Sequence, residues 1–275
     1  MNFDDKITRM HLKHGRTNME FGFFFIALIA TTLGAITGMG GGVMLRPALD
    51  LFSNLDALSV SMMSSISVFS MTIISIGKQV QQKSIPPLTL SAALALGSLI
   101  GGNIGQFLLS NIVRNTENHL VIITQNAILA FFILIVLIYM QSKSKIPSRN
   151  LQGILPGILT GFALGTLASF LGIGGGPINV AIIIYLFGLN TKAATLCSLV
   201  TIFFSQAANL FSAFVFHSHS SYDFSLVLPL IIGAIMGGFL GAICNKKMRT
   251  ETVERTFKII SLIVLGVCVL NMINA

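Results

Sequence analysis

Long uncharged stretches alternate with short charged ones along the whole chain. The stretches without Lys, Arg, Asp or Glu are 21–45, 57–77, 84–113, 118–142, 150–191, 193–222, 224–245 and 259–275. A membrane-spanning helix needs about 20 mostly apolar residues, and most of these stretches reach that length. They lack the alternation of apolar and polar residues that marks the strands of a membrane β-barrel. The pattern therefore predicts an all-α integral membrane protein with about eight hydrophobic segments.

The composition supports this class and excludes others. Only 9% of the 275 residues are charged, whereas about 25% is usual in soluble domains. The mean hydropathy is +0.85. The charged regions between the stretches are short, which leaves no room for a soluble catalytic or nucleotide-binding domain. The formal net charge is +8. We expect the basic residues behind it to lie in cytoplasmic loops and not to bind nucleic acid.

Two glycine patterns occur twice, in the same order, in the two halves of the chain. The sequence GMGGG at 38–42 is matched by GIGGG at 172–176, 134 residues later. A second pattern, GxxxGGxxG, begins at Gly97 and again at Gly233, 136 residues later. We therefore expect two homologous halves of about four hydrophobic segments each. The expected parts are an N-terminal tail at 1–20, a first transmembrane repeat at 21–140, a basic linker at 141–150 and a second transmembrane repeat at 151–275.

The first pattern predicts a broken helix in each half. Residues 150–191 would form a straight helix of roughly 63 Å at 1.5 Å per residue, about twice the thickness of the hydrocarbon core. Consecutive glycines are where such a segment breaks, because glycine is costly inside a helix and adopts backbone angles closed to other residues. In transporters built from internal repeats, such breaks point to the substrate site. Close packing without a ligand is the alternative.

The second pattern is typical of helix packing. Glycines at these spacings share one helical face and let two helices approach closely. We expect them to serve packing and not substrate binding. They are Gly97, Gly101, Gly102, Gly105, Gly233, Gly237, Gly238 and Gly241.

Two topologies remain open at this point. Eight simple crossings would place Lys246, Lys247 and Arg249 outside, against the tendency of basic loops to remain in the cytoplasm. If each glycine-broken segment instead enters and returns, the halves become inverted repeats. Most basic residues beyond the N-terminal tail then lie on one side. We favour inverted repeats.

Arg46 is the strongest candidate for contact with a substrate. It lies four residues after Gly42 inside an apolar region, and an ionisable residue at membrane depth is costly to hold there. Its planar guanidinium suits carboxylate, phosphate or sulfonate. The alternative is a structural ion pair with Asp50, four residues further along the same helix.

Backbone and neutral side chains complete the expected site. A half-helix that starts after a glycine break presents free N–H groups and the positive end of its dipole. The two breaks could therefore face one anion near the middle of the membrane. The expected substrate-binding residues are Gly40, Gly41, Gly42, Arg46, Gly174, Gly175, Gly176, Asn179, Ser61, Ser65, Ser198, Gln206 and Asn209.

Other chemistry finds little support in the sequence. The three cysteines form no CxxC motif, and no HExxH or GxSG motif occurs, so neither a metal site, a disulfide framework nor an intramembrane protease is indicated. His217, His219 and Asp223 are expected in a solvated loop. We expect no enzyme activity, no metal and no cofactor.

The doubled motif resembles the sulfite exporter TauE/SafE family of membrane transporters. The resemblance rests on GMGGGVMLRP at 38–47 and GIGGGPINVA at 172–181. It implies a multi-pass carrier of small anions, often sulfur oxyanions or organosulfonates, in the cell inner membrane. The family's proline a few residues after the glycines is matched by Pro47, whereas the second half has Ala181 there and Pro177 directly after the glycines.

Together these features predict a secondary transporter that moves a small anion, by alternating access and in the direction of export. The expected partners are the lipid bilayer, the anionic substrate, and a coupling proton or cation. The sequence leaves the oligomeric state open. An anion channel, or a transporter of another small solute, is the alternative, because channels also use broken helices.

Overall fold

The computed structural model describes residues 21–53, 55–83, 86–143, 145–216 and 226–274. Within these ranges the regular elements are all α-helices, and six of them are long and apolar enough to cross a membrane. The prediction of an all-α, multi-pass membrane protein is therefore confirmed. The helices are Phe21–Thr37, α2 (Gly42–Phe52), α3 (Ala57–Gln81), α4 (Leu88–Asn115), α5 (Asn118–Ser142), α6 (Ile154–Phe170), α7 (Pro177–Phe187), α8 (Thr191–Phe216), α9 (Val227–Lys247) and α10 (Thr250–Asn274).

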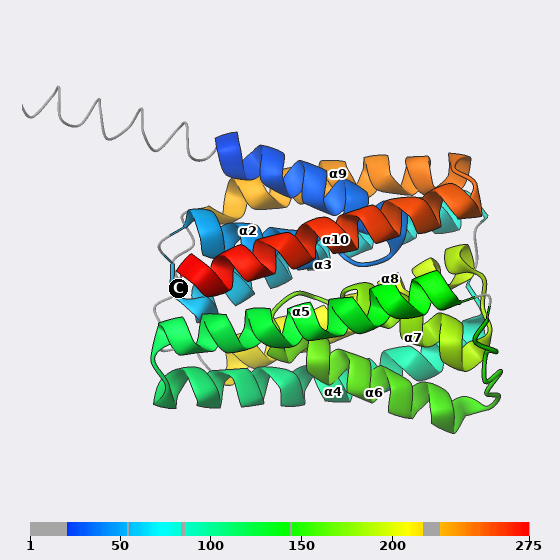
Figure 1. Cartoon of the computed structure of the whole chain (residues 1–275), viewed down its shortest axis with the longest axis horizontal. Coiled ribbons are helices and arrows are strands. Elements are labelled where there is room, and N and C mark those ends of the chain that lie inside the picture. Colours follow the sequence, from blue (N-terminus) through cyan, green and yellow to red (C-terminus); the bar gives the residue numbers. More distant parts are fainter. Residues whose placement is uncertain (1–20, 54, 84–85, 144, 217–225, 275) are drawn as a thin grey trace, which may run out of the picture.

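The same order of helices occurs in both halves of the chain. Each half begins with two short helices and continues with three long ones (Figure 1). The short pairs are Phe21–Thr37 with α2 and α6 with α7. Over the described residues, the longer member of each pair has 17 residues and the shorter has 11. At 1.5 Å per residue, α6 is about 26 Å long and the 11-residue helices are about 17 Å long, below the roughly 30 Å of the hydrocarbon core.

Each short pair is a helical hairpin that returns to the end of the molecule where it began. In the first half, Gly22 and Phe23 line a pocket together with Phe52, the last residue of α2. In the second half, the backbone N–H of Leu151, just before α6, donates to the carbonyl of Leu186 in α7 at 2.8 Å. Figure 1 shows the dark blue first helix and α2 with their outer ends on the same side.

Left-handed glycines make both reversals. Gly38 has a φ of +75° directly after the first helix, and Gly172 has a φ of +62° one residue beyond Leu171, the C-cap of α6. Residues with a Cβ rarely adopt such angles. The reversals therefore lie at the two GxGGG sequences because glycine alone permits the turn at low cost.

The second glycine pattern packs one long helix of each half, α4 or α9, against the hairpin of the other half. On α4, a methyl group added to Gly97 or Gly101 would overlap the α6 backbone at Ile158 or Phe162. On α9, a methyl group added to Gly233 would lie 2.6 Å from the carbonyl of Phe24, and one on Gly241 would lie 2.5 Å from that of Thr32. The packing role predicted for this pattern is confirmed.

We expect Gly101→Val to lower the thermal stability of the purified protein strongly. The valine side chain would displace the α6 backbone, and overpacking of this kind costs about 1–3 kcal/mol or more. Gly266→Val is the control, because no atom lies within 4 Å of a methyl group added to Gly266 in α10. Equal unfolding temperatures for the two variants, measured in the same detergent, would contradict the packing role of Gly101.

Basic residues gather at one end of the helices, which we call the basic end. There Lys192 Nζ donates to the carbonyl of Lys246 at 3.4 Å, and Lys246 Nζ donates to the carbonyl of Gln82 at 3.3 Å. Lys143 Nζ forms an ion pair with Glu254 at 2.6 Å. In Figure 1 this end is on the right, opposite the marked C-terminus.

Candidate functional site

The two glycine breaks meet inside the protein. A methyl group added to Gly40 would lie 3.5 Å from the carbonyl oxygen of Gly174, and one added to Gly42 would overlap the carbonyl of Ile173. The breaks lie 134 residues apart in the chain but touch through their backbones. Both GxGGG sequences therefore contribute to one central junction, with the carbonyls of the second break beside the start of α2.

Each break is held by a long helix of the opposite half. On α8, Ser198 Oγ donates to the carbonyl of Gly38 at 2.6 Å, and Thr195 Oγ1 donates to that of Thr37 at 3.2 Å. On α3, Ser61 and Val68 lie against Gly172 and Gly174 of the second break. The hydroxyl of Ser198 therefore serves the backbone of the first break in this conformation.

Arg46 extends from α2 to the second break. Its side chain is 2% exposed, and its Nη2 donates to Oε1 of Gln125 on α5. Its Nε lies 3.7 Å from Oδ2 of Asp50, whose side chain is also 2% exposed. A methyl group on Gly172 would overlap Nη1 of Arg46. The ion pair with Asp50 is present, but it is buried at the junction of the two halves.

Two donors at this junction are unused. Among the described residues, Nη1 of Arg46 and Oγ of Ser61 are buried and have no hydrogen-bond partner. Both groups lie against Gly172, since a methyl group there would be 2.5 Å from Ser61 Oγ. A buried guanidinium N–H beside a hydroxyl is a suitable pair of donors for an oxyanion.

The other predicted polar residues fall into two groups. Asn209 Nδ2 donates to Ser65 Oγ at 2.8 Å, which joins α8 to α3. In the part of the chain that the structure describes, both amide atoms of Gln206 and Nδ2 of Asn179 lack partners. Asn179 lies beside the second break, where a methyl group on Gly175 would be 3.1 Å from its Nδ2. His217, His219 and Asp223 lie outside the described residues.

Three amides that the sequence analysis missed organise the surroundings of Arg46. Gln125 accepts from Arg46 and donates through Nε2 to the carbonyl of Phe170, the last residue of α6, at 2.7 Å. Asn271 Nδ2 donates to the carbonyl of Pro47 at 3.0 Å and lies 3.3 Å from Oδ1 of Asn126. The sequence feature that could have identified them is an amide side chain inside an otherwise apolar stretch.

A polar pocket reaches Asp50 from the end of the molecule opposite the basic end. Its volume is about 290 Å³. The polar residues that line it are Asp50, Ser53, Asn118, His119, Asn271 and Asn274. A polar approach to the buried ion pair is therefore available from this end.

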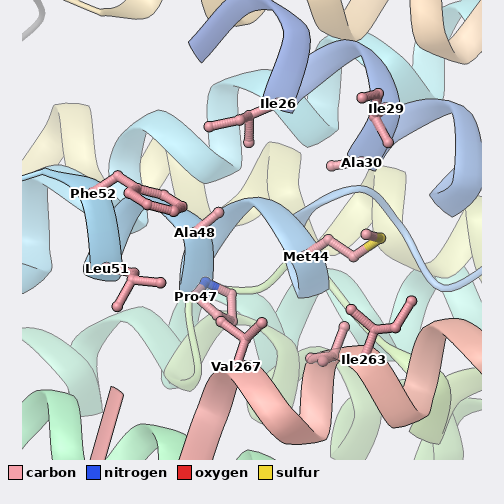
Figure 2. A pocket seen from close by; sticks show the side chains of 11 residues that line it. Ile26, Ile29, Ala30, Met44, Pro47, Ala48, Leu51, Phe52, Ile263 and Val267 are labelled. Atoms are coloured by element: carbon pink, nitrogen blue, oxygen red, sulfur yellow. The ribbon is translucent and has the colours of Figure 1, made fainter. Parts of the chain in front are cut away.

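A second cavity beside α2 has a different character. It has a volume of about 300 Å³ and lies between the first hairpin and α10. Figure 2 shows that the labelled side chains around it are apolar, from Ile26 and Ile29 on the first helix to Ile263 and Val267 on α10. This cavity offers no charged group to an anion. The candidate anion site is therefore beside Gly172, where Nη1 of Arg46 and Oγ of Ser61 lie.

Comparison with known proteins identifies the family of this chain. The family model described as "Sulfite exporter TauE/SafE" matches residues 23–272, which is nearly the whole chain. The chain belongs to this family. It is accordingly a multi-pass membrane transporter of the TauE/SafE family.

A curated relative supports the same class. The chain is 26% identical over 264 residues to a protein of Bacillus subtilis (strain 168) named "Probable membrane transporter protein YunE", with 87% of this chain and 93% of that protein covered. No solved structure gives a significant match.

Proposed function

We propose that this protein is a secondary transporter that moves a small anion, namely sulfite, another sulfur oxyanion or an organosulfonate, across the cell inner membrane. The observation that carries the proposal is Arg46, a guanidinium buried where the two glycine breaks meet, with Nη1 free of hydrogen-bond partners among the described residues. Export by alternating access is the proposed direction and mechanism.

The chemistry of Arg46 favours an oxyanion. A guanidinium presents parallel N–H groups that match two oxygens of a sulfonate or sulfite, and charge-assisted hydrogen bonds are about twice as strong as neutral ones. Nη2 and Nε are directed to Gln125 and Asp50. The unpartnered Nη1 and the hydroxyl of Ser61 remain for the anion. Gln206 and Asn179 are further unpartnered groups for its other oxygens.

The arrangement of the halves supports alternating access through inverted repeats. We propose that each hairpin enters and leaves on one side and that each half crosses the membrane three times. An odd number of crossings turns the second half upside down relative to the first. The basic end is then cytoplasmic, as basic loops tend to be. Because each break is held by the opposite half, a movement between the halves changes both breaks together.

The test is anion flux in proteoliposomes that contain wild type, Arg46→Gln or Arg114→Gln. Sulfite, thiosulfate and methanesulfonate are supplied in turn. Removal of the charged donor is expected to cost about 2 kcal/mol of binding, or roughly 30-fold in affinity. Arg114 is an exposed arginine in the last turn of α4, so its variant controls for the loss of a positive charge.

The expected result is saturable flux of at least one of these anions, lost in Arg46→Gln and retained in Arg114→Gln, when equal amounts of folded protein are compared. Flux that rises linearly with concentration would indicate a channel instead. Equal flux in wild type and Arg46→Gln would remove Arg46 from the site and with it the proposal.

A further inference from the structure

The buried charges around Arg46 balance when the site is empty. Arg46 and Asp50 carry opposite charges, and both side chains are 2% exposed. The amides that neighbouring helices bring to this region are neutral, namely Gln125 and Asn126 on α5 and Asn271 on α10. The charged residues of α10 lie in its first turns, at the basic end. An anion therefore approaches a site with no net charge.

An anion bound alone would leave one uncompensated negative charge inside the protein. Such a charge is expensive away from water. A positive charge taken up together with the anion removes that cost. The acceptor is present, because the buried carboxylate of Asp50 lines the polar pocket and has the neutral amide of Asn126 beside it.

We propose that Asp50 is the coupling site, and that it takes up one proton for each monovalent anion that Arg46 binds. The proton neutralises the carboxylate that faces Arg46, which frees the guanidinium for the anion. Protonated Asp50 also becomes a donor. Oδ1 of Asn271, which is buried, lines the same pocket and has no partner in the described chain, can accept from it. This inference rests on the proposed anion-binding role of Arg46.

Two other titratable groups face this region. His119 lines the same pocket, but its side chain is 48% exposed and its Nδ1 lies 3.3 Å from Glu117. Cys268 is a buried free thiol on α10. Asp50 differs from both because it lies 3.7 Å from the guanidinium that the anion needs. A change of its charge therefore acts directly on the anion.

The coupling fixes the direction of the pH dependence. The anion-bound protein holds one more proton than the empty protein, so anion binding strengthens as the pH falls. Where Asp50 is ionised in the empty protein, the dissociation constant of a monovalent anion is expected to rise tenfold for each unit of pH. In Asp50→Asn an amide that does not titrate replaces the carboxylate, and this dependence on pH disappears.

The experiment measures binding of methanesulfonate, thiosulfate and sulfate to the purified protein by calorimetry. The charges of these three anions stay fixed between about pH 5 and pH 8. A dependence of binding on pH in this range therefore comes from titrating side chains of the protein. The variants are Asp50→Asn, Asp50→Glu and Asp56→Asn. Asp56 is the N-cap of α3, where Asn caps equally well, so its variant removes a nearby carboxylate without touching the pair.

For methanesulfonate, the monovalent probe, we expect the tenfold slope in wild type, Asp50→Glu and Asp56→Asn, and a flat profile with tight binding at high pH in Asp50→Asn. Binding in buffers of different ionisation enthalpy counts the protons taken up by wild type directly, which keeps the test valid if Asp50→Asn does not fold. Proton uptake of one per monovalent anion supports the proposal.

Three outcomes overturn it. A flat wild-type profile without proton uptake does so, as does a slope that persists in folded Asp50→Asn. A dissociation constant that responds to sodium and not to pH would assign the coupling to a metal cation. If binding depends on Arg46 but shows any of these results, only the coupling fails. If no probe binds in an Arg46-dependent manner at any pH, the proposed function fails with it.

Discussion

Gly172→Ala is expected to abolish anion binding and to destabilise the protein. A methyl group at this position would overlap Nη1 of Arg46 and lie 2.5 Å from Ser61 Oγ. The residue also has a φ of +62°, where a residue with a Cβ costs about 1–2 kcal/mol. The guanidinium cannot keep its place beside the second break, so the donors for the anion are lost together with the turn. Calorimetric binding and thermal unfolding measure the two effects.

The comparison with matched glycines separates the clash from the backbone strain. Gly38→Ala places a Cβ at the equivalent turn, with a φ of +75°, but its neighbour is Thr195 and not Arg46. Gly77→Ala in α3 meets no atom within 4 Å and is expected to stabilise by about 0.5–1 kcal/mol.

A second substitution tests the cause. Shortening Arg46 to Ala is expected to restore part of the stability lost in Gly172→Ala but none of that lost in Gly38→Ala, because contacting residues couple and separated ones add. If Arg46→Ala rescues neither variant, or both equally, then contact between Gly172 and Arg46 does not explain the loss.

Hydrophobicity and glycine spacing were sufficient to predict much of this fold. Uncharged stretches of spanning length exclude a soluble protein on energetic grounds, and the packing role of glycines such as Gly101 follows from their helical spacing. The reversal of the chain at each break could not be predicted from hydrophobicity and glycine spacing; it was favoured only by the positions of the basic residues. A glycine permits a turn and a kink alike, and the pocket shared by Gly22 and Phe52, which distinguishes them, is a matter of tertiary structure.

The surroundings of Arg46 were harder to predict than Arg46 itself. A lone arginine in an apolar region is conspicuous because its burial is costly. Its partner Gln125 is one amide among many polar residues in the hydrophobic segments, and nothing local distinguishes it from an amide bonded to its own helix. Asn126 is such a case, since its Nδ2 donates to the carbonyl of Ile122 at 2.9 Å.

The site is asymmetric although the GxGGG sequence occurs in both halves of the chain. At the 134-residue spacing, Thr195 corresponds to Ser61 and Ile202 to Val68, and each of these residues packs on a glycine of the opposite break. Arg46 corresponds to Val180, which is fully buried. The two halves therefore share the framework of the breaks, and the charged pair was placed in the first half alone.

Gln125→Leu is expected to destabilise the protein by about 3 kcal/mol, since removing one partner of a buried charge typically costs about 3–5 kcal/mol. Leucine preserves the volume but leaves Nη2 of Arg46 without its acceptor and the carbonyl of Phe170 without the Gln125 donor. Anion affinity is expected to fall as well, because Arg46 loses the contact that positions it. Gln141→Leu, at an exposed position near the end of the same helix, is expected to change neither quantity.

Gln125→Glu distinguishes positioning from simple structural support. Glutamate retains an acceptor for Arg46 but loses the donor to the carbonyl of Phe170 and adds a buried charge, so its stability is expected to lie between those of wild type and Gln125→Leu. Anion affinity is nevertheless expected to fall more than tenfold, because a second carboxylate competes for the guanidinium and repels the anion. If instead affinity follows stability across the glutamine, glutamate and leucine proteins, Gln125 supports the fold without positioning Arg46. A separation of the two quantities assigns it to the site.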